Sequence, residues 1–140
     1  MVNRFPRSAA GPPAARWSSL LRLAFWAAAL FAFVMAVLPH PPQVPGAPND
    51  KIQHIIAFVT LAALGAWAYR GWSLLRLAIG LSLFGALIEV VQMIPALHRD
   101  SDVLDWIADT AAVMGVLLLV SWWRRDAGRR AAGGAGSGRR

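Results

Sequence analysis

The sequence predicts an all-α protein, an integral membrane bundle of four transmembrane helices with short loops. Hydrophobic residues make up 57% of the 140 residues and charged residues only 15%, whereas soluble domains are typically about half apolar and about a quarter charged. The apolar residues fall into four runs, each long enough to cross a hydrocarbon core of about 30 Å. The basic residues gather at the ends of these runs, as is typical of membrane proteins.

The first predicted helix covers residues 20–38 and is interrupted only by Arg22 near its start. A cleaved signal peptide is the alternative, because basic residues precede the run. The apolar part is longer than that of a signal peptide, and no clean A-x-A cleavage site follows it, so we favour a retained helix. Residues 1–18 are polar and basic and contain proline, which predicts a disordered basic N-terminus.

Three further helices are predicted at residues 52–69, 73–94 and 102–123. The prolines between residues 39 and 48 favour an extended loop before the second helix. The turn at residues 70–72 is so short that helices two and three should be antiparallel neighbours. Pro95 is expected to close the third helix. Residues 19–123 therefore form one transmembrane domain, and a disordered Arg/Gly/Ala tail is predicted at residues 124–140.

The composition excludes several classes of function. The chain contains no cysteine, which rules out a disulfide framework, a thiolate metal site and a cysteine nucleophile. Its net charge of +7 could indicate nucleic-acid binding, but the basic residues lie at the ends of apolar runs rather than along one helix face. We therefore expect the lipid bilayer as a partner, and no nucleic acid.

The distribution of basic residues predicts the orientation in the membrane. Four crossings place both termini on the same side, and nearly all arginines lie on that side, whereas Lys51 and Arg99 are the only bases on the other. The positive-inside rule then places both termini in the cytoplasm. The proline-rich loop and the turn at residues 95–101 face outward, and the tryptophans, such as Trp122 and Trp123, are expected to anchor the helices at the interface.

Polar side chains from three helices fall together at the outward end of the predicted bundle. Ionisable groups at a helix centre in lipid cost about 2.5–3.5 kcal/mol each on insertion scales, so they are by default functional or internally paired. We expect them to line a polar pocket that opens outward. The predicted pocket residues are Lys51, His54, Glu89, Gln92, Arg99, Asp105 and Asp109.

Three further carboxylates are interpreted as helix caps or loop charges. Asp102 is placed to cap the N-terminus of the fourth helix, and Asp50, or its neighbour Asn49, to cap the second. Asp100 is interpreted as a solvated loop charge. A purely structural role is the alternative within the pocket set, because an ion pair of Arg99 with Glu89 or Asp105 could simply hold the helices together.

The acidic excess limits the kind of ligand that such a pocket would bind. Six carboxylates at the outward end face only two bases there, so protons or a bound cation must balance the difference. A lipid headgroup, an amine-bearing envelope molecule or a cation would suit this balance. One histidine and several acids on different helices form no diagnostic metal-ligand spacing, so no metal site is predicted and no cofactor is identified.

The order of these motifs resembles the VanZ-like family of small bacterial integral membrane proteins. The resemblance covers about residues 20–123, with Asp109 where the family often has Asn and Ala112 where Gly is common. It implies a multi-pass protein of the bacterial cytoplasmic (inner) membrane. The founding member is associated with low-level teicoplanin resistance, and no mechanism is established for the family. The matching positions are Asp50-Lys51-x-x-His54, Glu89-x-x-Gln92, Arg99, Asp102 and Asp105.

Two functions of different class follow. The first is a VanZ-like membrane protein whose acidic pocket binds a cell-envelope component or a cation, with a role in envelope homeostasis or glycopeptide tolerance. The alternative is a membrane-embedded enzyme that acts on an envelope lipid or precursor through acid–base chemistry of the carboxylates and His54. No nucleophile motif supports the enzyme, since Ser101 is the only serine in the cluster. A transporter would need a homo-oligomer.

Overall fold

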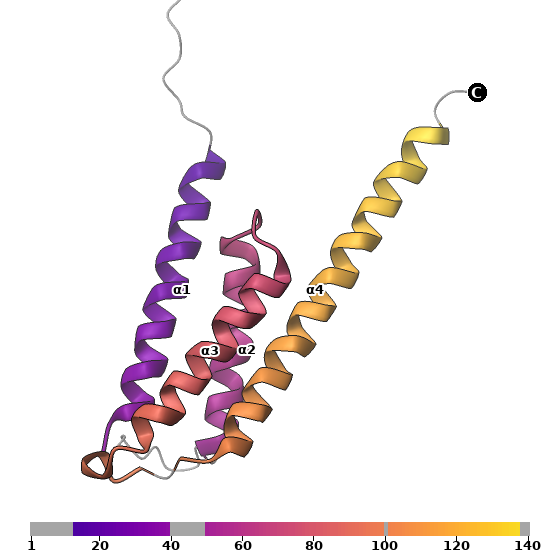
Figure 1. Cartoon of the computed structure of the whole chain (residues 1–140). Helices are drawn as coiled ribbons and strands as arrows, with labels where there is room; N and C mark the ends of the chain where they lie inside the picture. The colour runs from indigo at the N-terminus through magenta and orange to yellow at the C-terminus, as the bar shows by residue number, and fades with distance from the viewer. Residues whose placement is uncertain (1–12, 40–49, 100, 138–140) are drawn as a thin grey trace, which may run out of the picture.

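The computed structural model describes residues 13–39, 50–99 and 101–137, and every regular element in these ranges is helical. These ranges contain four long helices, which Figure 1 labels, and one short 3₁₀ helix between the last two. Their bounds are α1 Pro13–Val37, α2 Asp50–Ala68, α3 Leu74–Gln92, η1 Pro95–Leu97 and α4 Val103–Ser137.

The predicted all-α class is confirmed. All four long helices are long and apolar enough to cross a membrane, which fits a multi-pass membrane protein. The third helix ends at Gln92, slightly before the predicted end, because Pro95 opens η1 and the residue before it, Ile94, is extended with ψ of 115°. A residue that precedes proline is disfavoured in the α region.

Both outer helices are longer than predicted, so the predicted disorder does not hold for residues 13–18 and 124–137. Proline is well tolerated as the first residue of a helix, and α1 starts at Pro13. The predicted tail continues α4 to Ser137; its Arg and Ala residues favour a helix, whereas the four glycines among residues 124–137 do not. Asp126 and Arg130 also form an i,i+4 ion pair at 2.9 Å on this extension. Residues 1–12 and 138–140 lie outside the described residues.

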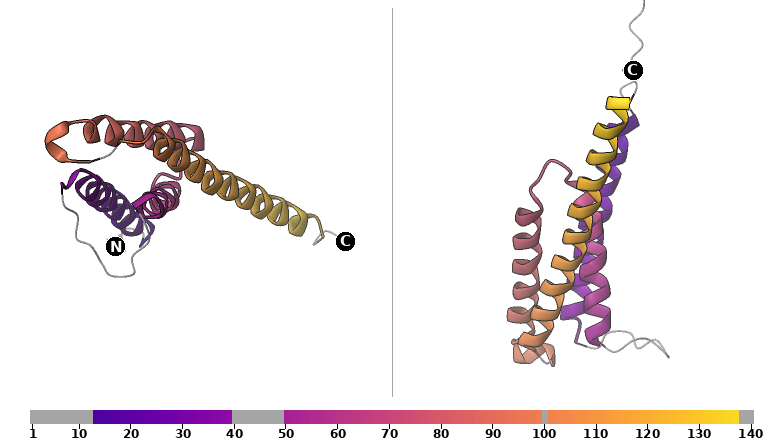
Figure 2. Two further views of the ribbon diagram at one scale, coloured as in Figure 1. Left: turned by 90° about the horizontal axis from the view of Figure 1, so that it is seen from below. Right: turned by 90° about the vertical axis from the view of Figure 1, so that its right-hand side faces the viewer.

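The helices alternate in direction, so the start of α1 and the end of α4 lie at the same end of the molecule (Figure 1). We call this the terminal end, and the opposite end, with η1 and the start of α4, the loop end. Helix α2 packs against both α1 and α4, and α3 packs mainly against α4. Helix α4 leans away from the other helices towards its C-terminus (Figures 1 and 2).

The core consists of buried apolar side chains from all four helices, with Phe58, Leu61, Ile88 and Val113 the largest that are fully buried. Small residues allow the helices to approach closely, as is common in membrane bundles. A Cβ atom on Gly85 of α3 would lie 3.3 Å from both Phe58 and Trp106. Glycine at this position therefore lets α2, α3 and α4 meet.

Arginines close the terminal end of the bundle. Arg124 of α4 donates a hydrogen bond to the carbonyl of Ala66 at 2.6 Å, and Arg22 of α1 donates to the carbonyl of Ala68 at 3.5 Å. The last carbonyls of a helix have no partner within the helix, so these two arginines satisfy the C-terminal end of α2. The contacts join three helices at the terminal end.

Candidate functional site

Glu89 of α3 holds the loop that leads into α4. Its carboxylate Oε2 accepts hydrogen bonds from the hydroxyl of Ser101 and from the backbone N–H of Asp102, both at 2.9 Å. The residue is buried, with 8% of its surface exposed. Hydrogen bonds to an ionised acceptor are stronger than neutral ones. Glu89 thus fixes the connection between α3 and α4.

Asp102 ties the start of α4 to two other helices. Its Oδ1 accepts a hydrogen bond from the backbone N–H of Leu104 at 2.9 Å, which is the N-cap geometry expected from the sequence. Its backbone N–H is the group that donates to Glu89 of α3. Its Oδ2 lies 3.4 Å from Nζ of Lys51 on α2. One loop residue therefore joins α2, α3 and α4.

Lys51 forms an ion pair with Asp105 as well as with Asp102. Its Nζ lies 2.9 Å from Asp105 Oδ1; this oxygen has no hydrogen bond of good geometry, so the contact is a charge pair. The Lys51 side chain is 43% exposed, and exposed ion pairs contribute little to stability. The pair does neutralise Asp105, which was expected to line an open pocket.

Gln92 of α3 reaches across to α1. Its Nε2 donates a hydrogen bond to the backbone carbonyl of Ala36 at 3.0 Å, and the residue is almost fully buried. Ala36 lies in the last turn of α1, where carbonyls lack partners within the helix. The role of Gln92 is therefore to secure the end of α1.

His54 and Asp109 form the deepest polar pair at the loop end. His54 Nδ1 lies 3.6 Å from Asp109 Oδ2, and the two side chains are 11% and 3% exposed. The second carboxylate oxygen of Asp109, Oδ1, is buried without a hydrogen-bond partner among the described residues. Leaving a buried acceptor unpaired costs about 1–3 kcal/mol, and more for a charged group. Burial of this pair therefore costs free energy of folding, and helix packing alone does not explain why an acid stands at this position.

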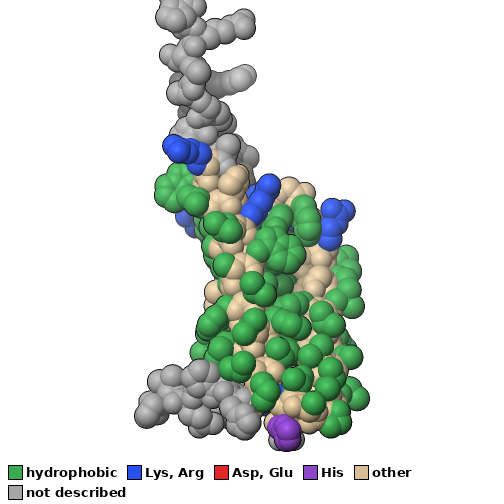
Figure 3. All heavy atoms as spheres, turned by 90° about the vertical axis from the view of Figure 1, so that its left-hand side faces the viewer, with side chains coloured by type: hydrophobic (Ala, Val, Ile, Leu, Met, Phe, Trp, Pro, Cys, Tyr) green, Lys and Arg blue, Asp and Glu red, His purple; other side chains and the backbone are tan. Residues whose placement is uncertain are grey.

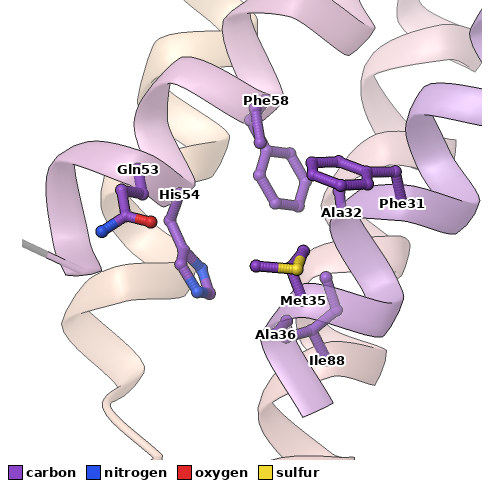
Figure 4. A pocket seen from close by; sticks show the side chains of 9 residues that line it. Phe31, Ala32, Met35, Ala36, Gln53, His54, Phe58 and Ile88 are labelled. Atoms are coloured by element: carbon purple, nitrogen blue, oxygen red, sulfur yellow. The ribbon is translucent and has the colours of Figure 1, made fainter. Parts of the chain in front are cut away.

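The ring of His54 borders a cleft between α1 and α2. The cleft has a volume of about 160 Å³, and Ile88 of α3 also lines it. Figure 4 shows the His54 ring turned towards Met35, with Phe31 and Phe58 above it. Asp109 does not line the cleft and reaches it only through His54. The cleft is therefore mostly apolar, with the imidazole of His54 and the amide of Gln53 at its wall.

The other predicted residues lie away from this cleft or outside the described residues. Arg99 is half-buried in the segment between η1 and α4. Asp50 is the first residue of α2, but its side chain and all of Asp100 lie outside the described residues. The predicted pocket set is thus divided among loop contacts, helix contacts and the His54–Asp109 pair. No carboxylate of the described residues lines the cleft.

The sequence reasoning missed a second polar contact between α3 and α4. The hydroxyls of Ser82 and Thr110 lie 3.0 Å apart. The indole N–H of Trp106 donates to the carbonyl of Ser82 at 3.0 Å, so this tryptophan lies between helices and is not an interfacial anchor. Isolated hydroxyls within apolar runs commonly bond across membrane helices, and that signal could have identified the contact.

The arrangement limits the chemistry that the site can perform. Within the described ranges, no group of three or more His, Asp or Glu side chains is placed to hold a metal ion. The one serine near the carboxylates, Ser101, donates its hydroxyl to Glu89 and is not beside His54. What the site offers is an imidazole whose orientation a buried carboxylate holds, facing an apolar cleft.

Comparisons of the chain with protein-family models, with curated proteins and with solved structures found no match.

Proposed function

We propose that this protein is a membrane-embedded binding protein for a cell-envelope lipid component, held in the cleft between α1 and α2. The observation that carries the proposal is the His54–Asp109 pair at the wall of that cleft. Apolar lining from Phe31, Met35 and Phe58 suits a lipid chain, and the imidazole suits a polar headgroup. Most ligand sites combine an apolar cavity with few polar groups in this way.

The buried Asp109 carboxylate acts on the ligand through His54, because it does not line the cleft itself. It lies 3.6 Å from Nδ1 of His54 and sets the orientation of the ring. An amine-bearing headgroup or a cation near His54 would reduce the uncompensated negative charge of the acids around it. The acidic excess at the loop end, now partly neutralised by Lys51, favours the same class of ligand.

The proposal is tested by thermal unfolding of the detergent-purified full chain with phosphatidylethanolamine or with Mg²⁺ alone. A ligand that binds only the native state raises its apparent stability, by about 2.7 kcal/mol at a hundred times Kd. We expect phosphatidylethanolamine to raise the Tm of the wild type. His54→Asn and Ala57→Leu should abolish the rise, because the first removes the imidazole and the second fills the cleft.

Matched variants serve as controls. His98→Asn makes the same exchange at an exposed loop histidine, and Ala111→Leu makes the same exchange at an exposed position of α4; both should keep the ligand-induced rise. A rise that is equal in the wild type and in His54→Asn would contradict the proposal. A rise in Tm with Mg²⁺ but not with the lipid would show that the ligand is a cation and not a lipid.

A membrane-embedded enzyme is the second candidate, and the same pair favours it. A carboxylate that orients a histidine is a recurring arrangement in acid–base catalysis. In that case His54 would transfer the proton and Asp109 would position the ring, with an envelope lipid or precursor as substrate. Asp109→Asn would then abolish turnover while leaving lipid binding largely intact, whereas a pure binding site would lose affinity in steps.

We further propose a place for this function in the cell. The order of motifs resembles the VanZ-like family, and the excess of arginine at the terminal end supports a bacterial cytoplasmic (inner) membrane with both termini in the cytoplasm. The cleft would then open in the outer half of the membrane, where envelope precursors are handled. Envelope homeostasis or glycopeptide tolerance is the corresponding physiological role.

A further inference from the structure

A second hollow lies between α1 and α3, away from the His54 cleft. This groove has a volume of about 360 Å³ and is lined almost entirely by apolar side chains, among them Phe25 and Ala29 of α1 and Leu81 and Phe84 of α3. Helices α1 and α3 make few direct contacts, which leaves the groove open. Figure 3 views the molecule from the side of α1, where hydrophobic side chains cover most of the surface.

One arginine and two aromatic rings line the polar end of this groove, and a second arginine, Arg22, lies beside one of these rings, outside the groove lining. Arg76 and Tyr69 line it, together with Trp72. The Arg76 guanidinium carbon lies 5.8 Å from the centre of the Trp72 ring, and that of Arg22 lies 5.6 Å from the Tyr69 ring. The two rings are 4.7 Å apart. We call Arg22, Tyr69, Trp72 and Arg76 the arginine–aromatic cluster.

The positive charge of this cluster is not balanced within the described residues. The one acidic residue near the terminal end there is Asp126, which pairs with Arg130. Neither Arg22 nor Arg76 forms an ion pair with a carboxylate in the described ranges. Figure 3 shows basic side chains at the upper, terminal end of the face and no acidic side chain among the described residues on it.

We propose that the groove between α1 and α3 binds an anionic phospholipid from the leaflet at the terminal end. One acyl chain lies in the groove, the phosphate contacts Arg76, and Arg22 beside the Tyr69 ring adds positive charge nearby. Arginine is suited to phosphate because its planar fork of donors matches the oxygens. Lipid tails are as apolar as leucine, so the acyl chain contributes through packing, and the headgroup provides the selectivity.

A second copy of the chain is a less suitable occupant of the groove. Copies in one membrane share one orientation, so the partner would bring its own arginine-rich terminal end to the same depth. The basic groups would then repel each other, because like charges at close range are unfavourable. An anionic headgroup removes this conflict. Each basic residue near an anionic membrane surface strengthens binding about fivefold.

Native mass spectrometry of the detergent-purified full chain, titrated with phosphatidylglycerol or phosphatidylcholine, tests the proposal. We expect the wild type to retain phosphatidylglycerol at lower lipid concentrations than phosphatidylcholine. Arg76→Gln should weaken phosphatidylglycerol binding about fivefold and weaken phosphatidylcholine binding less, because the choline cation offsets the charge of its phosphate. Gly80→Leu should abolish both, because Gly80 lines the groove and its added side chain meets no atom of the fold within 4 Å at Cβ.

The matched controls are Gly115→Leu and Arg129→Gln on α4. A Cβ on Gly115 would also meet nothing within 4 Å, and Gly115 does not line the groove, so both controls should bind phosphatidylglycerol like the wild type. Equal binding of the two lipids by the wild type, or equal binding by Gly80→Leu and Gly115→Leu, would overturn the proposal. A dimer that forms without lipid and that Gly80→Leu dissociates would also overturn the proposal. His54→Asn should retain phosphatidylglycerol, which separates this site from the cleft.

Discussion

At the residue scale, the buried polar groups of this protein mostly bind its own backbone. Glu89 accepts two hydrogen bonds from the loop before α4, and Gln92 donates one to the end of α1. Buried polar groups in lipid must find partners within the protein, and these two have done so. Asp109 differs, because one of its carboxylate oxygens has no partner among the described residues, which is why the candidate site centres on it.

Removal of the Glu89 carboxylate should destabilise the α3–α4 connection. In Glu89→Ala the Ser101 hydroxyl and the Asp102 N–H lose their acceptor, at a cost of about 1–3 kcal/mol. Thermal unfolding in detergent measures the change. Glu89→Gln keeps an acceptor oxygen and should lose less. If Glu89→Ala were as stable as the wild type while lipid binding at the cleft disappeared, Glu89 would belong to the ligand site instead.

At the scale of the elements, contacts between helices depend on small residues at particular positions. Gly85 lets Phe58 of α2 and Trp106 of α4 approach α3, and the hydroxyls of Ser82 and Thr110 join α3 and α4 about one turn away. Apolar burial alone does not hold helices together in lipid, so close packing and hydrogen bonds across the interface must. The α3–α4 contact uses both.

Gly85→Val should therefore weaken the bundle. A Cβ at Gly85 already lies 3.3 Å from Phe58 and Trp106, and the added methyl groups would force these rings apart. Overpacking of this kind typically costs about 1–3 kcal/mol. Gly115→Val makes the same exchange where a Cβ meets nothing within 4 Å. A lower Tm for Gly85→Val than for Gly115→Val is the expected result, and equal values would show that the contact is loose.

At the scale of the whole molecule, the two ends differ in charge. The terminal end carries most of the arginines, and the loop end carries most of the carboxylates together with Lys51 and Arg99. This asymmetry predicts the orientation, and the absence of cysteine makes it measurable. Ala96→Cys and Gly128→Cys each introduce a single thiol, one in η1 and one in α4.

A membrane-impermeant maleimide applied to intact cells should label the Ala96→Cys variant. The Gly128→Cys variant should react only after the membrane is permeabilised, because the positive-inside rule predicts that the arginine-rich end faces the cytoplasm. The opposite labelling pattern would show that the protein has the inverse orientation in the membrane. The His54 cleft would then open towards the cytoplasmic leaflet and the anionic lipid groove towards the outer one.

The sequence by itself determined the four helices, the common side of the two termini and the position of the Asp102 cap. These features depend on local patterns: the length of apolar runs, their number, and the residue that precedes a helix. The additional turns at the start of α1 fit a proline at the first helical position followed by alanines, whereas the glycines of residues 124–137 oppose the extension of α4. The prediction of disorder gave most weight to charge, polarity and glycine content.

Only the tertiary structure decided which polar side chains meet. Glu89, Gln92 and Asp109 were all placed near one depth by counting residues, but their partners depend on how each helix rotates about its axis and crosses its neighbours. These angles arise from the packing of Gly85, Phe58 and the other core residues, and no local pattern encodes them. The cleft beside His54 depends on the position of α1 next to α2. Gln92 helps to fix the end of α1 in this position through its hydrogen bond to the carbonyl of Ala36.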